Sequence, residues 1–136
     1  MLTPQELLVQ FLTDAEDRLQ YLADDVEYRL PTSLWDGLAG RHSCKQAVSA
    51  MLTAVLTNVY DAATIDPEVH ALFGTDEYAT AVFTMRATTA WGQPYENDYS
   101  MTIRCKDGKI VQVYELLDTK RVFDTLDLTS VTSSVT

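Results

Sequence analysis

In the first part of the chain, hydrophobic residues recur at helical spacing, and capping sequences mark where helices begin. Thr3 to Glu6 reads T-P-Q-E, a capping box with proline at the first helical position. The same box pattern recurs at 13–16 and 43–46, each time before apolar residues at helical spacing. We therefore predict three helices, which begin near residues 4, 14 and 44, and expect the second to end about Asp24.

Beyond the third helix, the apolar residues alternate with polar ones, which is typical of strands. This pattern predicts strands at about 65–73, 77–90, 95–106 and 110–117, and a shorter one at 26–31 lies before the third helix. Asp107-Gly108 is the clearest hairpin signal between them. Helices followed by a strand meander indicate one α+β domain over residues 1–126. Residues 127–136 have little to bury, and we expect a flexible tail.

The last strand carries one acidic side chain among apolar ones. In K-I-V-Q-V-Y-E-L-L-D-T-K, alternation places Glu115 on one face with Val111, Val113 and Leu117. A buried carboxylate is costly unless it is paired or protonated, and burial raises its pKa. Such an acid in an apolar pocket is a candidate general acid or base.

A structural role for Glu115 remains open at this point. Its partner would be Arg86 or Arg104, or a hydrogen bond from Tyr99. The neighbouring strand places Asn97 and Tyr99 on the inward face. These two side chains either satisfy each other's hydrogen bonds or orient a ligand oxygen.

Composition and charge narrow the choice of partners. The chain has 136 residues, of which 46% are hydrophobic, and a formal net charge of −10. The acidic balance argues against nucleic acid and anionic membranes as partners. No apolar run is long enough to span a membrane, and the first residues lack the pattern of a signal peptide. We therefore expect a cytoplasmic protein.

The sequence offers no signature of a cofactor or metal site. Cys44 and Cys105 lie far apart, and His42 and His70 have no metal-ligand spacing to each other or to a cysteine. The five glycines are isolated, so no phosphate-binding loop is predicted. We expect reduced thiols, no metal and no cofactor.

Three phrases carry a family resemblance: Y-L-A-D-D-V-E-Y-R-L-P, G-R-H-S-C-K-Q-A-V and the stretch from Y-E-N-D-Y-S to E-L-L-D-T. Together with the element order they resemble the nuclear-transport-factor-2-like superfamily, in particular its SnoaL-like, ketosteroid isomerase-related branch. The resemblance implies a cone-shaped, curved mixed β-sheet closed by three N-terminal helices, as in cystatin-like folds. It also implies an apolar pocket and a homodimer.

The resemblance to ketosteroid isomerases does not extend to their catalytic groups. The position of their base falls on Leu30, before Pro31. Their two oxyanion donors fall near Leu7 or Leu8 and near Met101. An enolate needs a base and hydrogen-bond donors. Because these positions are apolar here, we do not expect ketosteroid isomerase activity.

The resemblance to limonene-epoxide hydrolases is partial but includes an acid. A carboxylate of their last strand lies in a phrase similar to Y-E-L-L-D and matches Glu115. Their arginine falls in the region from Thr84 to Arg86, so Arg86 is a candidate for it. Their second acid has no counterpart in this sequence.

Two further residues complete the expected site. Tyr28 shares a face with Val26 and Leu30 and should point inward, and Trp35 lies in the following loop, where an aromatic side chain can line a pocket mouth. With Arg86, Asn97 and Tyr99 they are the candidate ligand-binding residues. The alternation does not assign a face to His70. Asp118 is expected to cap the turn that ends the last strand.

Two functions are compatible with these residues. The first is an enzyme that isomerises, cyclises, dehydrates or hydrolyses a small apolar organic molecule with Glu115 as general acid or base. The second is a binding or dimeric structural module without chemistry. We expect the dimer to form through the outer face of the sheet, where threonines such as Thr80, Thr84, Thr88 and Thr102 are frequent.

Overall fold

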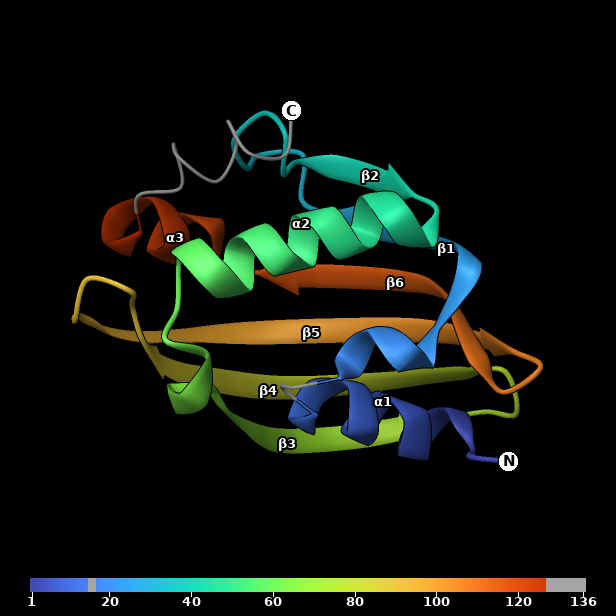
Figure 1. Ribbon diagram of the computed structural model, residues 1–136. Coiled ribbons are helices and arrows are strands. Elements are labelled where there is room, and N and C mark those ends of the chain that lie inside the picture. The colour runs from blue at the N-terminus through green and yellow to red at the C-terminus, as the bar shows by residue number, and fades with distance from the viewer. Residues whose placement is uncertain (15–16, 127–136) are drawn as a thin grey trace.

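The structure is a computed structural model that describes residues 1–14 and 17–126 and contains one six-stranded sheet with helices on one face (Figure 1). The strand order is β2-β1-β6-β5-β4-β3; β1 and β6 are parallel and the other neighbours are antiparallel. The strands are β1 (Leu22–Leu30), β2 (Gly40–Ser43), β3 (Asp66–Gly74), β4 (Tyr78–Thr88), β5 (Pro94–Lys106) and β6 (Lys109–Leu117). The helices are α1 (Pro4–Thr13), α2 (Lys45–Asn58) and α3 (Thr119–Thr125), with 3-10 turns η1 (Arg18–Tyr21) and η2 (Ala62–Thr64).

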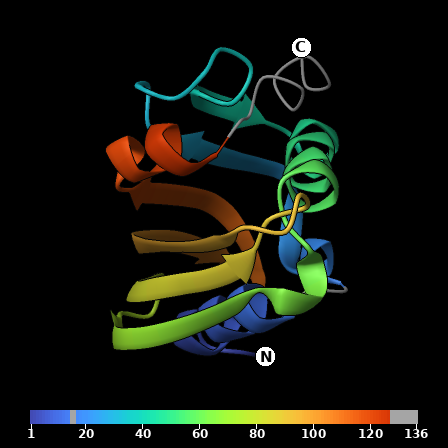
Figure 2. The same cartoon turned by 90° about the vertical axis from the view of Figure 1, so that its left-hand side faces the viewer.

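The sheet curves around the helices, which confirms the predicted α+β cone (Figure 2). Helix α1 packs against β3 and β4, whereas α2 packs against β1 and β2, so the two helices cover opposite halves of the inner face. Helix α3 follows β6 and contacts β5. The inner face between these helices is therefore where a pocket can form.

Helix α1 forms as the capping sequence predicts. The hydroxyl of Thr3 accepts a hydrogen bond from the Glu6 amide, and the Glu6 carboxylate accepts one from the Thr3 amide. Both bonds satisfy amides that a helix start leaves without partners. The buried face of the helix consists of Leu7, Leu8, Phe11 and Leu12.

The predicted second helix is wrong. It was expected to begin at 13–16 and to end about Asp24. Residues 15 and 16 lie outside the described residues. The described residues that follow form the 3-10 turn η1 and then enter β1. Strand β1 starts at Leu22, earlier than predicted, and Leu22 is buried and pairs with Ile110 of β6. Sheet pairing and burial thus override the local helical pattern.

Helix α2 is present, but its predicted cap is wrong. Ser43 is the last residue of β2, a strand that the sequence did not predict, and it pairs with Glu27. The residue before the helix is Cys44, which makes no side-chain capping bond. Its backbone has φ 73° and ψ 153°, a region that a residue with a Cβ rarely adopts.

A β-bulge changes which residues of β6 share a face. Arg104 of β5 pairs with Gln112, but Cys105 pairs with Ile110, so Val111 has no opposite partner. Ile110 and Val113 are buried, whereas Val111 is not. The prediction that Val111 shares a face with Glu115 is therefore wrong, while Val113 and Glu115 remain on the same face.

The end of β6 leads into a helix that the sequence did not predict. Asp118 has the predicted capping role, because its carboxylate accepts a hydrogen bond from the Arg121 amide at 3.2 Å. This cap opens α3, whose Val122 is buried. The predicted arrangement of three N-terminal helices is thus corrected to α1, α2 and a C-terminal α3. The predicted tail, 127–136, lies outside the described residues.

The four-strand meander is confirmed with small shifts of its boundaries. Strands β3 to β6 correspond to the four predicted strands. The hairpin between β5 and β6 turns at Asp107 and Gly108, which have φ values of 53° and 76°. Two consecutive residues with positive φ make the tight turn that this dipeptide favours.

Replacement of Cys44 by glycine should stabilise the protein. Glycine adopts the backbone angles of this position without a Cβ penalty, and the expected gain in the free energy of unfolding is about 1 kcal/mol. Urea denaturation should show a higher midpoint with an unchanged slope. The control Cys44→Ala removes the thiol but keeps the Cβ, so an equal gain in that variant would contradict a backbone origin of the effect.

Candidate functional site

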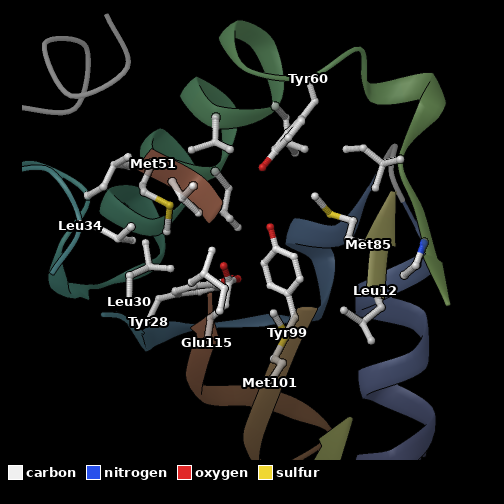
Figure 3. Close-up of a pocket in the computed structure, with 18 of the residues that line it drawn as sticks. Leu12, Tyr28, Leu30, Leu34, Met51, Tyr60, Met85, Tyr99, Met101 and Glu115 are labelled. Atoms are coloured by element: carbon white, nitrogen blue, oxygen red, sulfur yellow. The ribbon is translucent and has the colours of Figure 1, made fainter. Parts of the chain in front are cut away.

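A cavity of about 120 Å³ lies between the inner face of the sheet, α2 and α3, and most of its wall is apolar (Figure 3). Strands β1, β4, β5 and β6 form the floor, and residues after β1 and from α3 close the side. This volume is close to that of engineered cavities of about 150 Å³ that hold benzene. The apolar lining includes Leu12, Leu30, Leu34, Leu38, Met51, Leu52, Val55, Leu56, Ile65, Phe83, Met85, Met101, Leu117, Val122 and Leu126.

Glu115 stands in the wall of this cavity, on the inner face of β6. The residue is half-buried, and the neighbouring Val113 is fully buried. Burial raises the pKa of the Glu115 carboxyl, although a hydrogen bond from Tyr28 and the charge of Arg18 act in the opposite direction. The protonated form of Glu115 is therefore favoured relative to an exposed glutamate.

Tyr28 holds the Glu115 carboxylate from the adjacent strand. The parallel register of β1 and β6 pairs Tyr28 with Val113, and the Tyr28 hydroxyl donates a hydrogen bond of 2.5 Å to Oε1 of Glu115. Burial and the nearby carboxylate raise the pKa of Tyr28 well above its ordinary value. Tyr28 therefore remains a neutral donor, and this is the one side-chain hydrogen bond of the Glu115 carboxylate among the described residues.

A second polar group consists of tyrosine hydroxyls. Tyr60, just after α2, and Tyr99, on β5, both line the cavity, and their hydroxyls point toward each other (Figure 3). The Tyr99 hydroxyl is 2.8 Å from that of Tyr95, which accepts a hydrogen bond from the Asn97 amide. Burial raises the pKa of Tyr60 and Tyr99 well above the ordinary value, so both are neutral donors.

Stacking fixes the position of Tyr99. Its ring lies 5.2 Å from that of Phe83 on β4, and the two rings are nearly parallel at 7°. Phe83 and Tyr99 are directly paired across the two strands. Such a pair holds the phenol in one orientation toward the cavity.

Arg18 of η1 brings a positive charge to the same cavity. Its Nε and Nη2 atoms are buried and have no hydrogen-bond partner, and its guanidinium forms no ion pair, within the described part of the chain. Its central carbon lies 5.8 Å from the centre of the Phe11 ring. Its charge nevertheless lowers the pKa of both Glu115 and Tyr28.

The structure brings together three of the residues predicted from the sequence: Tyr28, Tyr99 and Glu115. The remaining three lie elsewhere. Asn97 is buried behind the phenols, where its amide nitrogen donates to Tyr95 and to the carbonyl of Asp118. Its hydrogen-bonding capacity is therefore used within the protein.

Trp35 and Arg86 are outside the cavity wall. Trp35 packs on Phe123 of α3, with ring centres 4.0 Å apart. The placement of Arg86 in the pocket is wrong: its side chain is exposed on the other face of β4 and forms ion pairs of 2.7 Å with Glu68 and Glu96. Met85 takes the inward position instead, because neighbouring residues of a strand point to opposite faces.

His70 also lies on the outer face of the sheet. Its Nε2 atom is 2.8 Å from the hydroxyl of Thr84, and that hydroxyl donates to the Asp98 carboxylate at 2.7 Å. His70, to which the sequence pattern assigned no face, therefore does not face the cavity.

Two polar residues of the cavity were not predicted from the sequence. Arg18 lies in the stretch where a helix was predicted, so no face could be assigned correctly to it. Tyr60 follows Val59, the last apolar residue on the buried face predicted for α2. A tyrosine at this point could have been predicted to line the pocket, because its ring is apolar and its hydroxyl is polar.

No group of three or more His, Cys, Asp or Glu side chains in the described part of the chain is arranged to hold a metal ion. Among the helices of residues 1–14 and 17–126, none is both long and apolar enough to cross a membrane.

Comparisons with known structures agree on the fold. An NTF2-like protein of unknown function from Burkholderia pseudomallei is 20% identical, with a TM-score of 0.73 and coverage of 91% of this chain and 97% of that chain. TerC co-crystallised with polyporic acid is 18% identical, with a TM-score of 0.74 and coverage of 90% and 97%. A proposed polyketide cyclase from Pseudomonas putida is 16% identical, with a TM-score of 0.71 and coverage of 93% and 100%.

A proposed isomerase from Bacillus subtilis has the same fold at 19% identity, with a TM-score of 0.68 and coverage of 89% of this chain and 90% of that chain. A comparison with curated proteins gives no match. Residues 13–113, more than half of the chain, match the family model described as SnoaL-like domain. This chain therefore belongs to the SnoaL-like domain family and has the fold of the NTF2-like structures.

Proposed function

We propose that the protein binds a small, mostly apolar organic molecule in this cavity and transfers a proton on it, with Glu115 as general acid and base. The observation that carries the proposal is the position of Glu115: a carboxyl in the wall of an apolar cavity, whose pKa burial raises. A raised pKa brings a carboxyl closer to the neutral range, where it can both accept and release a proton.

The other polar groups of the cavity suit the same chemistry. In the proposed step Glu115 takes a proton from a carbon next to a carbonyl, and the electron pair moves to the carbonyl oxygen. The neutral hydroxyls of Tyr60 and Tyr99 would donate hydrogen bonds to that developing oxyanion. Return of the proton to another position completes an isomerisation, and attack of the carbanion on a second carbonyl gives a cyclisation.

The related structures support this class of reaction at family level. Two of them are described as a polyketide cyclase and an isomerase, and a third was crystallised with polyporic acid. A cavity of about 120 Å³ favours a molecule with the bulk of a single ring.

A binding module without chemistry is the second candidate, and the Tyr28–Glu115 hydrogen bond is the observation that favours it. In that case the bond would hold Glu115 as a fixed acceptor rather than a proton carrier. Loss of catalysis in a Glu115 variant separates the two candidates.

Replacement of Glu115 by glutamine should remove proton transfer but keep the shape of the site. We expect exchange of the benzylic hydrogens of phenylacetone in D₂O, followed by ¹H NMR, to fall by about 10²-fold or more. The matched control is Glu96→Gln, an exposed residue paired with Arg86 on the other face of the sheet. Exchange that is equal in Glu115→Gln and the unmodified protein would contradict the catalytic role.

The same substitution should stabilise the protein at neutral pH. Because the folded pKa of Glu115 is raised above the ordinary value near 4.5, the folded state binds the proton more tightly than the unfolded state. Stability is therefore lost as pH rises from about 4.5 through the raised pKa. Thermal unfolding should show a higher Tm for Glu115→Gln at pH 7 and a smaller difference at pH 4. A constant difference at both pH values would argue against this linkage.

We also propose that the protein forms a homodimer through the outer face of the sheet, as the family resemblance implies. Three apolar side chains are exposed there: Phe73 at 58%, Val82 at 40% and Leu116 at 62%. Val82 and Leu116 both lie opposite Ser100, so they belong to one row across β4, β5 and β6. Such a patch is typical of a surface that another protein covers.

Substitution of Leu116 by aspartate should convert this dimer into a monomer, because a charge in an apolar interface lacks a partner. Analytical ultracentrifugation measures the change in mass. Leu2→Asp is the control, since Leu2 is exposed at 41% but lies before α1. A mass that stays the same in Leu116→Asp, whether monomer or dimer, would count against this interface.

A further inference from the structure

Arg18 is a polar residue of the cavity that the proposed reaction does not use. Its side chain lines the cavity, yet two of its nitrogens are buried without a partner among the described residues. A buried N–H group without a hydrogen bond is destabilising, and more so when the group is charged. Such a group in a native structure needs an explanation, and a partner that binds in the cavity is one.

The identity of the two nitrogens indicates the shape of that partner. Nε and Nη2 lie next to each other on one edge of the planar guanidinium, and their N–H bonds form a fork. A carboxylate matches this fork with two parallel hydrogen bonds. A single hydroxyl or carbonyl oxygen would satisfy the edge less completely.

The surroundings of Arg18 favour an anion that comes from outside the chain. Glu115 is the acidic group of the same cavity, but it is bound to Tyr28 and forms no ion pair with Arg18 in the described residues. Its guanidinium also lies over the Phe11 ring, which has no acceptor oxygen.

We propose that the ligand is a carboxylic acid with an apolar body, and that Arg18 binds its carboxylate. This inference rests on the proposed function, because it adds a substrate class to the same cavity. The carboxylate occupies the end of the cavity formed by Arg18, and the apolar body lies along the aliphatic wall. Arg18 is thus a specificity-determining residue that selects acids over neutral molecules of the same shape.

The test compares two probes of nearly equal shape, phenylacetate and its neutral isostere phenylacetamide, by isothermal titration calorimetry at pH 7. Charge-assisted hydrogen bonds should give an affinity ratio of roughly 10–150 in favour of phenylacetate. Arg18→Met should lose this preference. Arg18→Lys, which keeps the charge but not the fork, should retain only part of it.

Two controls distinguish ligand binding by Arg18 from an effect of net charge or of protein stability. Arg41→Met changes the net charge equally at an exposed position and should keep the preference. Arg18→Met should unfold at the same or a higher temperature without ligand, because it removes a buried charge that has no partner in the described part of the protein. A purely structural role for Arg18 predicts a clear loss of stability instead.

The outcomes also distinguish this inference from the proposed function. Glu115→Gln should lose proton transfer and keep the preference for phenylacetate. Three results would overturn the role of Arg18. They are equal binding of the two probes, a preference for phenylacetate that persists in Arg18→Met, and no binding of phenylacetate at about 10 mM. None of these results bears on whether Glu115 moves a proton on a neutral ketone.

Discussion

The parallel pairing of β1 and β6 is the contact on which the rest of the site depends. It joins residues far apart in the sequence and places Tyr28 opposite Val113, from where its hydroxyl reaches Glu115. A buried carboxyl needs such a donor, since its charged form is otherwise disfavoured. Without this register, Glu115 would be an uncompensated acid in an apolar wall.

Alternation along the strands predicted much of the fold and half of the site. Glu115 and Tyr99 were placed on the inner face correctly because β5 and the second half of β6 are regular. The bulge at Val111 breaks the same rule within one strand, and sequence alone gives no sign of an extra residue. The predicted placement of Arg86 in the pocket is wrong for a related reason. An error of one residue in the register of β4 moves a side chain to the opposite face of the sheet.

The remaining errors arise where tertiary contacts override local signals. The apolar stretch that ends at Leu22 satisfies a helical pattern, but the sheet needs Leu22 as a buried partner of Ile110. Because β1 begins at Leu22, residues 18–21 form the short turn η1 instead of a helix. Arg18 lies in this turn, and its side chain lines the cavity. The position of its guanidinium depends on a strand boundary that only the assembled sheet determines.

The polar groups of the cavity do not lie where the resemblance to ketosteroid isomerases would place them. The positions that the resemblance assigns to the isomerase base and to one of its donors, Leu30 and Met101, are apolar parts of the wall. The polar groups come instead from β6, from the residue after α2 and from η1. Since these elements surround the same space, a different set of groups can serve it without a change in the backbone, and the site rather than the fold decides the reaction.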